Sequence, residues 1–186
     1  MEKKDDFQAP ERAALPRETV SPKGLPERQE AGNRVTEAGA AGSAKEIEAQ
    51  IRALFDKSRF RANFLPFQID SIQCGRCQIS LQIEEADHAD DLGEVHGGVL
   101  AALADAVLVI TAASVGEAAR PVSLSLDFIN NADFGTTVRM TGVIRHHGRT
   151  TMVVSGEMYD ECGRMLATMQ ATMMNTGTIQ NVPRQW

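Results

Sequence analysis

The sequence predicts an α+β domain in which an antiparallel sheet of about six strands wraps around one long apolar helix. Six segments alternate apolar and polar residues, as strands with one buried face do. One run, residues 97–116, is apolar on all sides and has the length of a helix. The elements follow in the order helix, two strands, long helix and four strands, which one sheet packed on one helix accommodates.

Each element has its own local signal. Ser43 is a typical helix cap, and the apolar residues after it recur at helical spacing: Ile47, Ile51, Leu54 and Phe55. In the third strand, Val122, Leu124, Leu126 and Phe128 are expected to form the apolar face. Tight turns are expected at Gly75, Gly148 and Gly163. The predicted strands cover 67–74, 76–84, 122–128, 137–145, 150–159 and 164–174.

The first 43 residues differ in composition from the rest of the chain. They contain four of the seven prolines and a single aromatic residue, Phe7. Such a segment buries too little surface to offset its ordering entropy, so we expect a disordered tail over 1–43, with a docking or regulatory arm as the alternative. The folded domain is predicted over 44–177, followed by a polar tail over 178–186.

Composition and charge exclude several classes of function. The net charge of −6 argues against nucleic acid or an anionic membrane as the partner. The long apolar run is Ala-rich, carries a carboxylate and lacks aromatic anchors, so we expect it inside the protein rather than in a membrane. Three cysteines and the absence of an apolar leader favour the cytoplasm. Neither a metal site nor a nucleotide cofactor is predicted.

The long helix carries one charged residue, Asp105, and begins with two glycines, Gly97 and Gly98. Burial of an ionised carboxylate costs free energy, or it raises the pKa so that the group stays neutral. Two interpretations of Asp105 stay open: it is a catalytic group, or it is a structural aspartate that faces water at an edge or pairs with an arginine. The N–H groups in the first turn of a helix lack intrahelical acceptors, and glycine lets a ligand approach them. The helix start is therefore a candidate oxyanion hole, with a plain flexible loop as the alternative.

The spacing of these two groups limits how they act together. Gly97 and Asp105 are eight residues apart, which is about 12 Å along a helix at about 1.5 Å per residue. A reacting centre needs both groups within about 3–3.5 Å. Two antiparallel copies of the helix, related by a two-fold axis, satisfy this requirement, so the sequence predicts a homodimer with active sites across its interface.

The stretch from Gly93 to Gly98, together with Asp105, resembles the signature of hotdog-fold acyl-CoA thioesterases. It is most similar to the branch typified by the phenylacetate-pathway enzyme PaaI. The Gly-x-x-His-Gly-Gly element and an Asp nine residues after the His match the family spacing, and the resemblance covers about 60–176. It implies the hotdog fold, a homodimer or homotetramer, and hydrolysis of acyl-CoA, with coenzyme A as part of the substrate.

The resemblance also implies roles for individual residues. Asp105 would be the nucleophile or a general base on water, and Gly97 N–H would polarise the thioester carbonyl from the opposite subunit. His96 would hold the loop and line the site. The family commonly has Asn six residues before this His, where this chain has Asp90, and an ionised Asp cannot donate a hydrogen bond. A second carboxylate near Asp105 would raise its pKa.

Four more residues are candidates for substrate binding: Gly98, Ser123, Arg145 and Arg149. The two arginines flank a turn that meets the phosphates of coenzyme A in similar thioesterases, although a solvated basic turn is the alternative. Because Asp90 replaces the usual Asn, a non-catalytic acyl-CoA-binding or sensing module is the second hypothesis for function. The low share of aromatic residues, 5%, favours a medium-chain aliphatic acyl group over an arylacetyl group.

Overall fold

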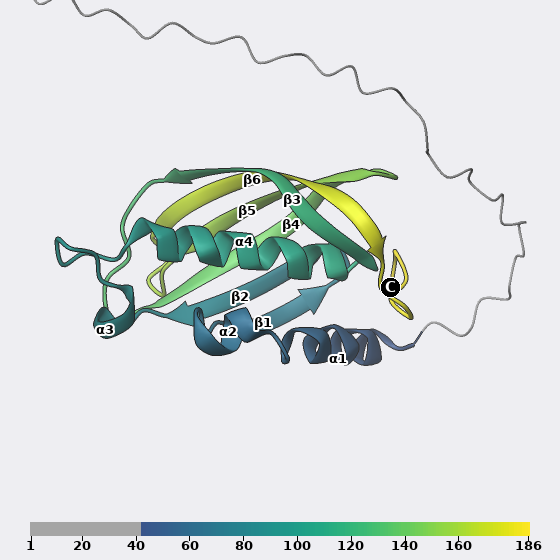
Figure 1. Ribbon diagram of the computed structural model, residues 1–186, viewed down its shortest axis with the longest axis horizontal. Coiled ribbons are helices and arrows are strands. Elements are labelled where there is room, and N and C mark those ends of the chain that lie inside the picture. The colour runs from purple at the N-terminus through teal and green to yellow at the C-terminus, as the bar shows by residue number, and fades with distance from the viewer. Residues whose placement is uncertain (1–41) are drawn as a thin grey trace, which may run out of the picture. The chain divides into compact units, whose positions relative to one another are not determined.

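A computed structural model describes residues 42–186. Its six strands form one antiparallel sheet in the order β1-β2-β4-β5-β6-β3, which curves around the long helix α4 (Figure 1). The predicted α+β architecture is therefore confirmed. The helices are α1 (Ala44–Phe55), α2 (Arg59–Asn63), α3 (Glu85–His88) and α4 (Gly97–Ala113), and the strands are β1 (Gln68–Gln73), β2 (Arg76–Gln82), β3 (Glu117–Phe128), β4 (Thr137–His147), β5 (Thr151–Tyr159) and β6 (Met165–Thr178).

Helix α1 begins where the sequence predicts. The Ser43 hydroxyl accepts from Glu46 N–H, and the Glu46 carboxylate accepts from Ser43 N–H, which completes a capping box. Ile47 and Ile51 bury the inner face of this helix. Most of the expected disordered tail, residues 1–41, lies outside the described residues. The short helices α2 and α3 are absent from the sequence prediction, because neither has enough residues for a periodic pattern.

Helix α4 forms the centre of the core. Its buried side chains pack against β2, β3 and β4, and Leu103, Val107 and Ile110 are fully enclosed. Gly142 on β4 permits this close approach, since a Cβ there would lie 2.5 Å from the hydroxyl oxygen of Thr111. No helix within 42–186 combines the length and the hydropathy required to cross a membrane.

The expectation that the long helix is buried on all sides is wrong for the single chain. One stripe of α4 stays uncovered by the sheet: Ala102, Ala106 and Val109 are half-buried, and Asp105 is exposed. The helix also ends at Ala113 rather than at residue 116, because Gly116 adopts φ 74° and turns the chain into β3. Residues 42–186 therefore leave an apolar stripe of this helix without a cover.

Strand β3 also differs from its prediction. It begins at Glu117, five residues before the expected start, and occupies one end of the sheet order. Val122 and Phe128, expected on the buried face, are 65% and 55% exposed. Register shifts between Ala118 and Ala119 and between Pro121 and Ser123 alter the alternation, so the simple period-2 pattern misplaces Val122.

The last residues, expected as a polar tail, pack against the end of α4. Trp186 donates its indole N–H to the backbone oxygen of Ser114 at 2.7 Å, and Val182 is buried. The guanidinium of Arg184 contacts the buried Glu117 carboxylate at 2.7 Å. Trp186 and Val182 thus anchor a C-terminal segment whose composition is mostly polar.

Replacement of Gly142 by alanine is expected to lower the free energy of unfolding by about 1–3 kcal/mol, because the new methyl group overpacks the contact between β4 and Thr111. Chemical denaturation measures the change. Gly177→Ala is the matched control: its nearest neighbour would be Ala118 Cβ at 3.9 Å, so we expect a change within about 0.5 kcal/mol. Equal losses in both variants would contradict the close packing of α4 on β4.

Candidate active site

The loop before α4 is shaped by the Asp90 carboxylate. Its Oδ1 accepts hydrogen bonds from the N–H groups of Leu92 at 2.8 Å and Glu94 at 3.0 Å. Asp90 N–H in turn donates to the backbone oxygen of Glu94 at 2.7 Å, and Ala89 and Val95 form a β-bridge. The hydrogen bond from Glu94 N–H, together with that from Leu92, lowers the pKa of Asp90. The ionised Asp90 carboxylate therefore stabilises the loop in which it lies.

His96 caps the long helix. Its Nδ1 accepts from Gly98 N–H at 2.8 Å, so that nitrogen carries no proton, and its own N–H donates to the backbone oxygen of His88 at 2.8 Å. A side chain at position 98 would meet the His96 ring, because a Cβ would lie 2.8 Å from Nδ1. The second glycine thus permits the cap, and its N–H is not available to a substrate.

Gly97 N–H is the available donor at the start of α4. Throughout residues 42–186, no acceptor is paired with it. The amide lies at the positive end of the helix dipole, and a pocket of about 290 Å³ and another of about 480 Å³ are both lined by Gly97 and Asp90. The Phe128 ring lies against Gly97, 3.6 Å from the position of a Cβ. This arrangement suits a donor that meets developing negative charge.

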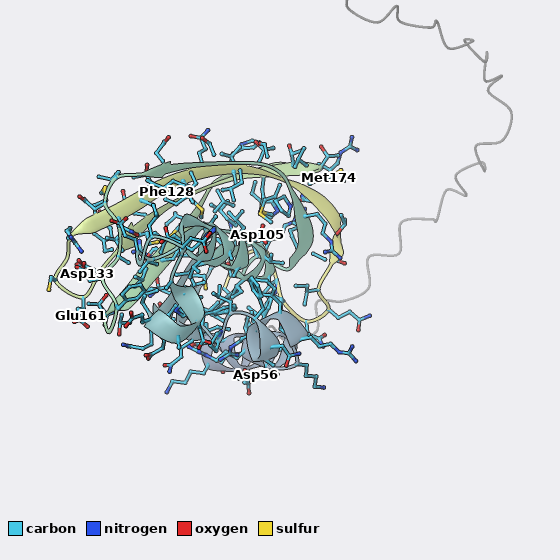
Figure 2. The ribbon with its side chains drawn as sticks, turned by 60° about the vertical axis from the view of Figure 1, so that its left-hand side comes forward. Asp56, Asp105, Phe128, Asp133, Glu161 and Met174 are labelled. Atoms are coloured by element: carbon cyan, nitrogen blue, oxygen red, sulfur yellow. The ribbon has the colours of Figure 1, made fainter. Side chains whose placement is uncertain are left out.

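Asp105 lies further along the same helix, on the uncovered stripe (Figure 2). Partial burial among small side chains raises the pKa of this carboxylate, although the side chain is exposed in the single chain. Burial is the cause of this pKa shift within one chain, and Asp90 does not contribute to it. In the described chain, Asp105 forms no ion pair.

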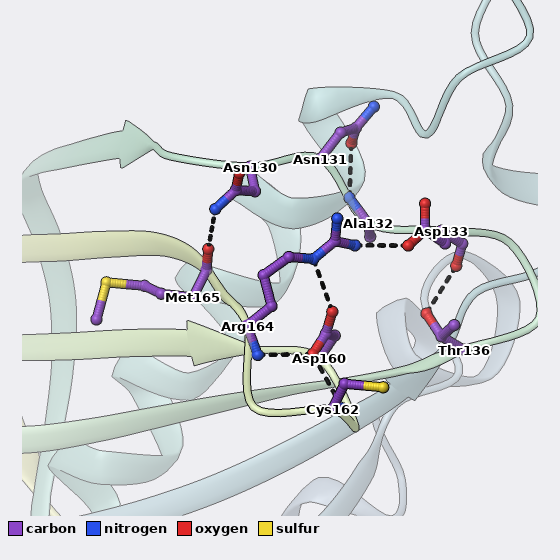
Figure 3. A network of polar contacts seen from close by, with 9 residues as sticks. All are labelled: Asn130, Asn131, Ala132, Asp133, Thr136, Asp160, Cys162, Arg164 and Met165. Atoms are coloured by element: carbon purple, nitrogen blue, oxygen red, sulfur yellow. Dashed lines mark hydrogen bonds and ion pairs between the residues drawn. The ribbon is translucent and has the colours of Figure 1, made fainter.

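The far wall of the smaller pocket comes from the segment after β3. Asn130 donates from its side chain to the backbone oxygen of Met165 at 2.7 Å, and Ala132 N–H donates to the side chain of Asn131 (Figure 3). Arg164 stabilises the same segment, because its guanidinium forms ion pairs with Asp160 at 2.9 Å and with Asp133 at 2.5 Å. The sequence pattern alone does not place these asparagines at the pocket.

The other candidate residues lie elsewhere. Ser123 faces the outer side of the sheet, where it lines a polar trough of about 640 Å³ together with Ser155. Arg145 donates from Nε to the Ser155 hydroxyl at 2.6 Å. Arg149 lies in the β4–β5 turn, near the end of α4 opposite Gly97, because His147, two residues earlier, contacts Glu117 at the start of β3. A single chain therefore does not bring these residues to Gly97.

The cysteines form no reactive cluster. Burial raises the pKa of Cys77 to about 12, which keeps this thiol protonated and unreactive. Cys74, Cys77 and Cys162 are all free. In the part of the chain that the structure describes, no group of three His, Cys, Asp or Glu residues has the arrangement of a metal site.

Replacement of Asp90 separates its charge from its role in the loop. Asn offers the same acceptor oxygen, so Asp90→Asn is expected to keep the amides of Leu92 and Glu94 protected from hydrogen exchange, whereas Asp90→Ala loses that protection. Exchange measured by NMR on both variants checks this. Equal protection in the wild type and Asp90→Ala would show that the carboxylate does not hold the loop.

Comparisons with known proteins agree with this geometry. Residues 92–167 match the model of the thioesterase superfamily. Among solved structures, the PaaI protein of the Escherichia coli phenylacetic acid degradation operon aligns with a TM-score of 0.69 and 22% identity over 74% of this chain and 99% of that one. A Streptococcus mutans protein bound to acetyl-CoA aligns with a TM-score of 0.59 and 24% identity over 61% of this chain and 91% of that one.

A Streptococcus pneumoniae hypothetical thioesterase with coenzyme A gives a TM-score of 0.59 and 22% identity over 61% of this chain and 88% of that one. A search of curated proteins gives no significant match. The six-stranded sheet around α4 and the structural neighbours show that this chain has the hotdog fold, and residues 92–167 are similar to the thioesterase superfamily.

Proposed function

We propose that this chain is an acyl-CoA thioesterase that converts an acyl-CoA and water into a carboxylic acid and the free thiol of coenzyme A. The observation that carries the proposal is the Gly97 N–H, which has no acceptor in residues 42–186 and belongs to a helix start that lines two pockets. A thioester carbonyl placed there develops negative charge on oxygen during attack, and this donor stabilises that charge.

Asp105 supplies the second catalytic group. As a general base, its carboxylate takes a proton from water while the water oxygen bonds to the carbonyl carbon. The carbon–sulfur bond then breaks, and the sulfur leaves as the thiol of coenzyme A after it receives a proton. As a nucleophile, the same carboxylate would first form an acyl-enzyme anhydride that water hydrolyses. The raised pKa makes the carboxylate a stronger base in either role.

Two chains are needed to bring these groups together. Gly97 and Asp105 are on one helix, separated by about 12 Å at about 1.5 Å per residue. Within residues 42–186, the uncovered stripe of α4 and the unpaired edge of β3, with the exposed Val122 and Phe128, are the candidate interface. We propose a two-fold dimer through this surface, alone or as half of a tetramer, in which Asp105 of one chain faces Gly97 of its partner.

This arrangement also gives a role in substrate binding to the two arginines at the β4–β5 turn. In an antiparallel pair, the end of α4 that is near Arg149 in one chain lies beside the start of α4 in the other. Arg145 and Arg149 are then candidates for contact with the phosphates of coenzyme A. Ser123 is a candidate for contact with a polar group nearer the middle of the coenzyme A molecule. Three free thiols support the reducing cytoplasm as the location of the reaction.

Asp105→Asn is expected to lower turnover by at least about a hundredfold, because the amide cannot accept a proton from water. Thiol release from a panel of acyl-CoAs, from acetyl to palmitoyl with phenylacetyl and benzoyl added, measures it. Asp56→Asn, the same change at an exposed site at the end of α1, is the control and keeps full activity. Stoichiometric acyl-CoA binding without thiol release in the wild type would favour the non-catalytic binding module instead.

The raised pKa of Asp105 predicts the direction of the pH dependence. Only the ionised carboxylate acts, so kcat/KM is expected to fall as the pH drops through a pKa above that of an ordinary aspartate. The profile is measured between about pH 4 and pH 8, which brackets that limb. The same pH profile is measured with an N-acetylcysteamine thioester, which has no phosphate to titrate. If kcat/KM falls in the same way, the fall is due to a group on the enzyme and not to the phosphates of coenzyme A. A rate that stays constant down to the ordinary aspartate pKa would contradict the assignment.

A further inference from the structure

The pocket beside Gly97 has an apolar wall and a polar end. Its volume is about 290 Å³, at the small end of the range for ligand pockets, which is about 300–1,000 Å³. Glu94, a residue that the sequence analysis did not select, lies at the polar end. The apolar lining comes from Val95, Leu100, Phe128 and Ile129, and the polar lining from Asp90, Glu94, Asn130 and Asn131.

Each side-chain amide at the polar end donates one of its two N–H groups to the protein itself. The Asn130 amide donates to the backbone oxygen of Met165 at 2.7 Å, and the Asn131 amide donates to the Glu94 carboxylate at 3.3 Å. No lysine or arginine lines this pocket. Gly97 N–H is required by the thioester oxygen, so the pocket offers an acyl group the remaining amide N–H groups, several acceptors and two carboxylates, with no positively charged side chain to pair with an anion.

We propose that this pocket selects short, uncharged acyl groups, favours those with a hydroxyl donor, and rejects those that end in a carboxylate, with Glu94 as the residue that sets this preference. The inference rests on the proposed thioesterase function and names its substrate class. It also narrows the expectation of a medium-chain acyl group, since a pocket of about 290 Å³ has little room for a longer chain.

Glu94 is a better test of this preference than Asp90. Both acceptor bonds to Asp90 Oδ1 hold the loop, so a change there also alters the position of Gly97. The side chain of Glu94 has one contact in the described chain, with Asn131, and a glutamine oxygen accepts the same bond. Glu94→Gln therefore removes a negative charge while the wall of the pocket keeps its shape.

The test compares acyl-CoAs of one shape and different polarity. Isovaleryl, 3-hydroxybutyryl and malonyl groups all branch at the third carbon, and they end in two methyl groups, a hydroxyl with a methyl group, and a carboxylate. Wild-type kcat/KM is expected to be highest for 3-hydroxybutyryl-CoA and lowest for malonyl-CoA, with about tenfold or more between isovaleryl and malonyl because like charges repel in a partly desolvated pocket.

In Glu94→Gln, the ratio of malonyl to isovaleryl kcat/KM is expected to rise about tenfold, as one like charge is removed. Glu157→Gln is the matched control, since its carboxylate is exposed on β5 and lines the outer trough, and it should leave the ratio unchanged. Equal wild-type rates for the malonyl and isovaleryl thioesters, or an unchanged ratio in Glu94→Gln, would overturn the inference. Absence of thiol release from every acyl-CoA would instead overturn the thioesterase function itself.

Discussion

The packing of α4 inside the curved sheet is the contact on which the rest of the structure depends. The helix buries Leu103, Val107 and Ile110, and Gly142 lets β4 approach it closely. Because the sheet encloses only part of the helix, one stripe with Asp105 stays uncovered. The same geometry places the start of the helix at a pocket, where Gly97, whose N–H has no acceptor within residues 42–186, is part of the lining. A shift of α4 would therefore move the donor and the carboxylate together.

The helix start shows how local hydrogen bonds leave one donor available. His96 takes the N–H of Gly98, and Asp90 takes the N–H groups of Leu92 and Glu94. Within residues 42–186 these contacts leave Gly97 N–H without an acceptor. The network of Asp133, Asp160 and Arg164 then fixes the segment that closes the pocket on its other side. Preorganised donors of this kind act without rearrangement during the reaction.

The sequence predicts the sheet, the helices α1 and α4, and the residues of the helix start, because periodicity and capping are local properties. It does not predict which stripe of α4 the sheet leaves open, since Leu, Val and Ala suit a core and an interface equally. The bulges that expose Val122 and the contacts that anchor Trp186 depend on tertiary packing. Glu94 lies inside the recognised motif, yet only the folded loop shows that it faces a pocket. Neither the sequence nor a single chain brings Arg149 to Gly97.

A complementation experiment tests most directly whether the active site is shared by two chains. Gly97→Pro removes the N–H donor at a helix position that tolerates proline, and Asp105→Asn removes the base. Each variant alone is expected to be inactive. If Gly97 and Asp105 act across the interface, co-expression yields heterodimers with one intact site, and the mixture recovers about a quarter of wild-type turnover. No recovery, with heterodimers demonstrated by mass spectrometry, would contradict the shared site.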